Sequence, residues 1–167
     1  RIENWYARLS GLIVFDKQNF HAEFGWSKEP TPFQNRMDLN YKKIEEGESW
    51  GEKWESAWFH LTGEVPNTWS GKQVSTDLDF SGEGLVFNSN GIAIQGITNG
   101  AIWDPNFART RVPFIDKCIG GEKIELWVEA AANSLFGVFT DPDPNEQSPK
   151  RHGWFDAKVE KMQFGIF

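Results

Sequence analysis

The sequence contains very few of the residues that build metal and redox sites: one cysteine and three histidines among 167 residues. A single cysteine, Cys118, can form neither an internal disulfide nor a thiolate zinc site. His21, His60 and His152 are far apart, and none stands in a pattern that supplies three or four converging ligands. We therefore expect isolated histidines and no cofactor bound to this chain.

Long apolar runs and excess positive charge are also missing. The longest apolar run near the start, residues 11–15, is far shorter than the ~20 residues that span a bilayer. The chain has 24 acidic and 17 basic side chains, and the net charge of −7 disfavours phosphate-rich partners. We expect neither a nucleic-acid nor a membrane partner. The length fits one domain, and the start at Arg1 and the apolar residues 164–167 suggest a piece cut from a larger protein.

No arrangement typical of nucleophilic or phosphate chemistry is present. The sequence has no G-x-S-x-G elbow, and its paired glycines at 82–84 and 120–121 fit turns better than phosphate loops. An acid pair for glycoside hydrolysis needs two carboxyl groups about 5–10 Å apart. Asp77 with Asp79, and Asp141 with Asp143, are the nearest candidates, and we interpret both pairs as solvated charges.

Aromatic residues are abundant, with 9 Trp and 14 Phe against 2 Tyr and 2 Met. Such an excess suits an aromatic-packed β core, an interaction surface or a sugar-stacking site. Trp50, Trp54 and Trp58 recur every four residues, but Gly47 and Gly51 weaken a helix there. Burial in a core or interface is the favoured interpretation, with sugar stacking as the alternative.

The periodicity predicts a chain of short strands joined by Gly, Pro and Asn turns, which is the pattern of an all-β sandwich or barrel. An amphipathic helix is predicted over 2–12, loops over 25–32, 45–53 and 140–153, and a hairpin turn at 89–91. Strands are predicted over 56–64, 72–80, 84–88, 92–97, 122–132 and 135–139. Residues 155–164 fit a closing strand or a helix, and a strand is favoured.

Four segments, in order, resemble one family. Residues 48–59 (ESWGEKWESAWF) are similar to a G-x-x-W-G-x-x-W-x-x-x-W-F stretch of glycoside hydrolase family 38 α-mannosidases, of the vacuolar/cytosolic and bacterial type. Residues 65–72 (VPNTWSGK), 82–97 (with GEGLVF, NG and QGI) and 129–137 (EAAANSLFG) continue the resemblance. The matching segments span about half of the chain, and residues before 47 match only loosely.

The resemblance implies a jelly-roll, galactose-binding-like β-sandwich with a short N-terminal helix. Residues 1–46 would be a lead-in of helix and loops, and residues 50–167 the sandwich. In the family this non-catalytic N-terminal domain precedes a zinc-dependent α/β barrel, so zinc belongs to the parent enzyme and no catalytic or metal residue transfers to this chain. The implied partner is the catalytic domain of the same polypeptide, in an intracellular, cytoplasmic enzyme that acts on α-mannosides and forms a homo-oligomer.

Seven residues remain as candidate contacts to a sugar or to another domain: Trp50, Trp54, Trp58, Glu83, Asn88, Trp103 and Asn133. For Glu83, Asn88 and Asn133 a local structural role at turns is the favoured interpretation. The accessory domain of an α-mannosidase is the first hypothesis. A free-standing carbohydrate-binding module, with a mannose-containing glycan as partner, is the second. A self-sufficient glycosidase is the third.

Overall fold

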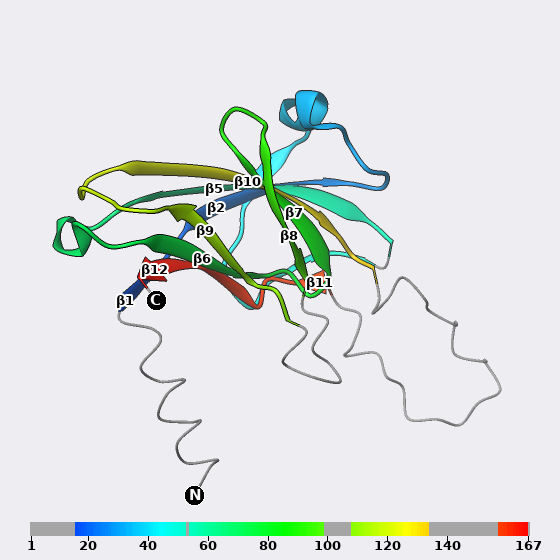
Figure 1. The fold of residues 1–167 in the computed structure, drawn as a ribbon. Coiled ribbons are helices and arrows are strands. Elements are labelled where there is room, and N and C mark those ends of the chain that lie inside the picture. Colours follow the sequence, from blue (N-terminus) through cyan, green and yellow to red (C-terminus); the bar gives the residue numbers. More distant parts are fainter. Residues whose placement is uncertain (1–15, 53, 99–107, 134–156, 167) are drawn as a thin grey trace, which may run out of the picture.

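The computed structural model describes residues 16–52, 54–98, 108–133 and 157–166. They form a six-stranded and a four-stranded antiparallel sheet that face each other, with a small two-stranded ribbon (Figure 1). In spatial order the six-stranded sheet contains β3 (Tyr41–Lys43), β2 (His21–Ser27), β5 (Ser56–Glu64), β10 (Lys123–Ala131), β7 (Glu83–Asn88) and β8 (Ala93–Thr98). The four-stranded sheet contains β1 (Asp16–Asn19), β12 (Lys161–Ile166), β6 (Val74–Asp79) and β9 (Arg111–Ile115), and the ribbon pairs β4 (Ser49–Gly51) with β11 (Ala157–Lys158).

Strand β5 lies in the middle of the six-stranded sheet, between β2 and β10. Its bounds are those predicted from the sequence, and Leu61 is opposite Leu126 of β10. Alternate side chains point to opposite faces, so Phe59 and Leu61 enter the core, where both are fully buried. The alternation predicted for this strand is confirmed.

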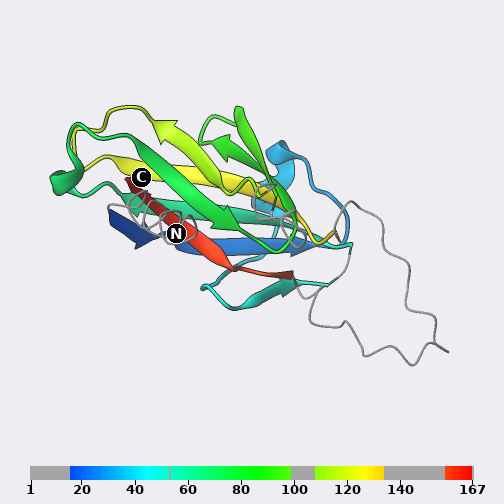
Figure 2. The same cartoon turned by 60° about the horizontal axis from the view of Figure 1, so that its bottom comes forward.

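The core fills the space between the two larger sheets. Figure 2 shows β1, β12, β6 and β9 side by side on the four-stranded side. Aromatic side chains supply much of the packing volume, and the largest fully buried ones in this core are Trp69, Phe59, Phe80 and Phe164. The aromatic excess of the sequence is therefore mainly a packing feature.

The 3₁₀ segment η1 (Phe33–Asp38) covers part of the outer face of the six-stranded sheet. The Phe33 ring packs edge-on against Trp58 and lies beside Phe87, with ring centroids 5.6 and 5.3 Å apart. Beside it, the β7–β8 hairpin turns at Gly91, whose φ of 78° is the left-handed conformation that glycine favours. The predicted Asn-Gly turn is confirmed. A second 3₁₀ segment, η2 (Asn67–Trp69), follows β5.

Several predicted boundaries are wrong. Residues 16–46 are no mere lead-in, because β1, β2 and β3 belong to the two sheets. The predicted loop at 25–32 begins inside β2, and the loop at 45–53 contains β4.

Two further differences concern the second half of the chain. The single strand predicted over 155–164 is two strands, because β11 pairs with β4 whereas β12 pairs with β1 and β6. Strand β9 was not predicted. The helix at 2–12, the strand at 135–139 and the loop at 140–153 lie outside the described residues. No helix in the described part of the chain is long and apolar enough to cross a membrane.

Candidate functional site

The three tryptophans at four-residue spacing have different environments. Trp50 and Trp58 are 3% and 1% exposed, whereas Trp54 is 52% exposed. Trp50 donates its indole N–H to the Phe80 carbonyl at 2.9 Å and packs edge-on against Phe59. Its ring is therefore part of the sandwich core.

Trp58 points away from the core and is covered by the segment before β3. Its indole N–H donates to the Thr31 carbonyl at 2.7 Å, and its ring lies against Phe33 and Phe87. Both rings are almost fully buried, at 3% and 1% exposure, so most of each ring surface is packed against the protein itself. Contact of Trp50 or Trp58 with a sugar or a neighbouring domain stays a prediction. Trp103 lies outside the described residues.

The predicted polar residues at turns make local bonds. Asn133 donates to the Glu83 carboxylate at 2.7 Å, and its own side-chain oxygen accepts the Glu83 backbone N–H at 3.1 Å. The Asn88 side-chain oxygen accepts the backbone N–H groups of Asn90 and Ile92, both at 3.0 Å. These reciprocal bonds hold strand ends and the β7–β8 turn, which confirms the structural interpretation of these residues. Their contact with a ligand stays a prediction.

Asp77, Asp79 and Cys118 make contacts within the domain. Asp77 forms an ion pair with Lys161 at 3.4 Å, and Asp79 accepts the Ser81 backbone N–H at 2.9 Å. Cys118 is buried and donates to the Trp69 carbonyl. Across the described ranges, no three His, Cys, Asp or Glu side chains come together as a metal site.

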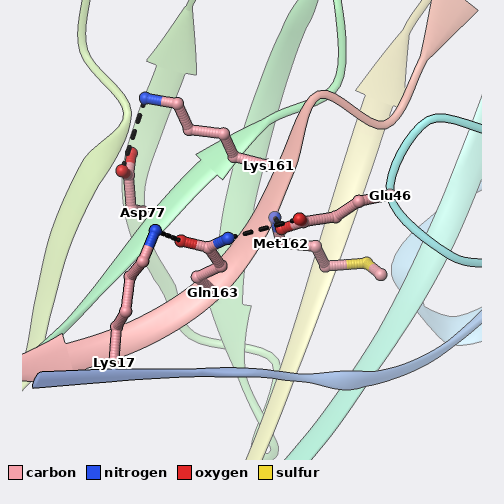
Figure 3. A network of polar contacts seen from close by, with 6 residues as sticks. All are labelled: Lys17, Glu46, Asp77, Lys161, Met162 and Gln163. Atoms are coloured by element: carbon pink, nitrogen blue, oxygen red, sulfur yellow. Dashed lines mark hydrogen bonds and ion pairs between the residues drawn. The ribbon is translucent and has the colours of Figure 1, made fainter.

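A polar network fastens the chain before β4 to strand β12 (Figure 3). Glu46 accepts the backbone N–H of Met162 at 2.7 Å and a side-chain N–H of Gln163 at 3.2 Å. The Gln163 side-chain oxygen in turn accepts a hydrogen bond from the Lys17 ammonium group at 2.7 Å. Glu46 thus satisfies a strand N–H group that would otherwise lack a partner at this end of the β1–β12 ladder.

An arginine lies between two aromatic rings on the outer face of the six-stranded sheet. The Arg36 guanidinium carbon is 3.7 Å from the Phe33 centroid and 4.2 Å from that of Trp127, a cation–π arrangement. Tyr41 donates its hydroxyl to the Arg36 carbonyl at 2.9 Å. Burial raises the pKa of Tyr41 to about 12, against the opposing effect of the Arg36 charge. These contacts close η1 onto the sheet.

A hollow of about 390 Å³ opens at the β3 edge of the six-stranded sheet, next to β4. Phe24 and Trp50, both 3% exposed, form its buried wall, whereas Trp26 is 48% exposed. Asn40, Lys42, Ser49 and Gly51 complete the lining.

Sequence reasoning missed Trp26, because the prolines at 30 and 32 placed it in a predicted loop. The alternation of Ala22, Phe24 and Trp26 was the signal that could have placed all three on one face of a strand.

The described fold is a jelly-roll β-sandwich, and the comparisons with known proteins identify its family. A family model described as "Alpha-mannosidase, jelly roll domain" matches residues 18–158. The chain belongs to this family of α-mannosidase jelly-roll domains.

Individual relatives agree with this assignment. The chain is 36% identical over 149 residues to "Alpha-mannosidase G" of Dictyostelium discoideum, covering 89% of this chain and 13% of that protein. It is 28% identical over 127 residues to "Alpha-mannosidase 2C1" of Homo sapiens, covering 71% of this chain and 11% of the relative. Because the chain spans so small a share of these relatives, it corresponds to an accessory, non-catalytic domain of the α-mannosidase type.

Among solved structures, a β-glucuronidase from Ruminococcus gnavus is similar over 92% of this chain and 29% of its own, with a TM-score of 0.52 and 13% sequence identity. At that identity the likeness shows the fold alone.

Proposed function

We propose that this domain supports the assembly and stability of an enzyme that hydrolyses α-mannosides of glycans. The observation that carries the proposal is the use of the family-like motif residues in the described fold. Trp50, Trp58, Glu83, Asn88 and Asn133 all bond to the protein itself. Because these side chains stabilise the domain itself, they fit a scaffold that holds a catalytic partner.

The partner in this proposal is a catalytic domain of the same polypeptide. That domain would carry the zinc ion and the catalytic carboxylate, while this domain would line the approach to the active site. The parent enzyme is proposed to be cytoplasmic and homo-oligomeric. The support is the family match together with the printed names of the relatives.

The test compares three polypeptides: this chain alone, the parent enzyme, and the parent without residues 16–166. Turnover of an aryl α-mannoside and the oligomeric state by light scattering are the two measurements. The proposal expects no turnover by this chain, and loss of the native assembly together with activity when the domain is removed. Turnover by this chain, or an unchanged enzyme without the domain, would contradict it.

A carbohydrate-binding module is the second candidate function. Neither Trp50 nor Trp58 offers an exposed ring face for stacking, because both are buried. The hollow beside Trp26 is the observation that favours sugar binding by this domain, and it can coexist with a supporting role.

A further inference from the structure

The hollow at the β3 edge has one aromatic wall that ligands can reach. Trp26 is half exposed, and its indole N–H donates to Glu55 Oε2 at 2.7 Å. The same oxygen accepts the Glu52 backbone N–H at 2.7 Å, so the carboxylate is itself held in place. The Trp26 ring is therefore oriented before any ligand arrives, which lowers the entropic cost of binding.

Three polar side chains line the hollow. Asn40, Lys42 and Ser49 are all exposed, and in the described part of the chain none makes a side-chain hydrogen bond. Lys42 extends over Phe24, with its ammonium nitrogen 4.9 Å from the ring centroid. An aromatic wall with a few convergent polar groups is the usual composition of a small-molecule site, and about 300–1,000 Å³ is the usual size.

Charged groups of both signs lie at the hollow. Lys42 supplies one positive charge, and Glu55, which lies against Trp26 and Gly51, supplies one negative charge. The chain as a whole carries −7, so its field repels anions. A neutral ligand with many hydroxyl groups and an apolar C–H face matches this environment better than a carboxylate or a phosphate.

We propose that the hollow binds one neutral hexopyranose ring of a glycan, with its C–H face against Trp26 and its hydroxyl groups bonded to Asn40, Lys42 and Ser49. The choice of an α-mannoside as the first probe rests on the proposed function, whereas the location of the site rests on the residues that line the hollow. Aromatic contact and a few hydrogen bonds place the dissociation constant for a single ring at about 1–10 mM.

The experiment is a ¹⁵N NMR titration of the whole chain with methyl α-D-mannopyranoside and, separately, methyl α-D-glucopyranoside. The indole N–H signals of the nine tryptophans report on each ring individually, and Trp26→Phe identifies the Trp26 signal. The proposal expects a saturable shift of the Trp26 indole signal with at least one of the two sugars. No shift with either sugar up to about 100 mM, ten times the expected constant, would overturn it.

Matched variants locate the site. Trp26→Ala is expected to weaken binding about 3–10-fold and Lys42→Met about 3-fold. Trp54→Ala removes a second tryptophan that is half exposed in the described part of the chain, and Lys43→Met changes the neighbouring lysine, which points to the opposite face of β3. Both controls should bind normally.

The amide spectra show which variants keep the fold, and Lys42→Met carries the test if Trp26→Ala does not fold. Equal weakening by Lys42→Met and Lys43→Met, or loss of binding in Trp54→Ala alone, would place the ligand elsewhere and overturn the proposal.

Binding of the glucoside but not the mannoside keeps the hollow as a hexose site and counts against an α-mannoside as its ligand. If the parent enzyme without residues 16–166 assembles normally while the isolated chain still binds the mannoside at Trp26, only the scaffold role is contradicted. The experiments therefore distinguish failure of the scaffold role from failure of the hexose site.

Discussion

Replacing Trp58 with phenylalanine measures how much stability a motif tryptophan provides. The indole N–H donates to the Thr31 carbonyl at 2.7 Å, and the ring is 1% exposed. Phenylalanine keeps an aromatic ring between Phe33 and Phe87 but leaves the Thr31 carbonyl without its donor, which costs about 1 kcal/mol. The smaller ring also leaves unfilled space, which costs about another 1 kcal/mol. The free energy of unfolding should therefore fall by about 2 kcal/mol.

Urea unfolding followed by circular dichroism measures this loss. With a denaturant slope of about 2 kcal/mol per molar urea, the midpoint should fall by about 1 M while the slope stays the same. Trp54→Phe is the matched control, because Trp54 is half exposed, and its change should stay within about 0.5 kcal/mol. A Trp58→Phe midpoint equal to that of Trp54→Phe would refute the reasoning.

Three further predictions concern a glycine contact and two acids with opposite behaviour. Gly82→Ala should lower the free energy of unfolding, measured in urea, by at least about 2 kcal/mol, because an added Cβ would lie 2.3 Å from the Ala131 carbonyl oxygen. In the control Gly96→Ala the nearest atom, the Gly84 carbonyl oxygen, would lie 3.8 Å from the added Cβ, so the loss should be much smaller. Equal losses in the two variants would contradict the packing argument. Backbone N–H donors lower the pKa of Glu122 below 4.5. Its carboxylate therefore stabilises the fold above pH 4.5, so Glu122→Gln should be less stable at neutral pH, with the difference vanishing as pH falls through the folded-state pKa. Burial raises the pKa of Glu129 above 4.5, so its carboxylate costs stability above the folded-state pKa. Glu129→Gln should therefore be slightly more stable than the unchanged protein at neutral pH, but not below pH 4.5. A change of stability with the same sign in Glu122→Gln and Glu129→Gln at neutral pH would contradict these assignments.

The regular parts of the fold follow from local pattern. Strand β5 alternates cleanly and ends before Pro66, so its bounds are readable from the sequence. Strand β9 contains Pro113, which argues against a strand, yet β9 lies at the sheet edge where proline is tolerated. Strand β4 is three residues long and ends at Gly51, and it exists because β11, far away in sequence, pairs with it. Long-range pairing of that kind leaves no local signal.

The candidate site was harder to predict for the same reason. The burial of Trp58 depends on η1, a segment with no clear sequence pattern that folds over the outer face of the sheet. Spacing alone therefore could not separate buried Trp58 from half-exposed Trp54. Turn chemistry was more informative, since the roles of Asn88 and Asn133 follow from local hydrogen bonding that such residues commonly make.

The central claim is that the motif tryptophans Trp50 and Trp58 form a scaffold, which leaves ligand contact to the β3 edge. Hydrogen–deuterium exchange of the assigned indole N–H groups tests it most directly, because exchange requires opening of the surrounding structure. The account predicts that Trp50 and Trp58 exchange more slowly than Trp26, because the Trp26 indole, although bonded to Glu55, belongs to a half-exposed ring at the sheet edge that can open without the core. Exchange at Trp50 and Trp58 as fast as at Trp26 would contradict it.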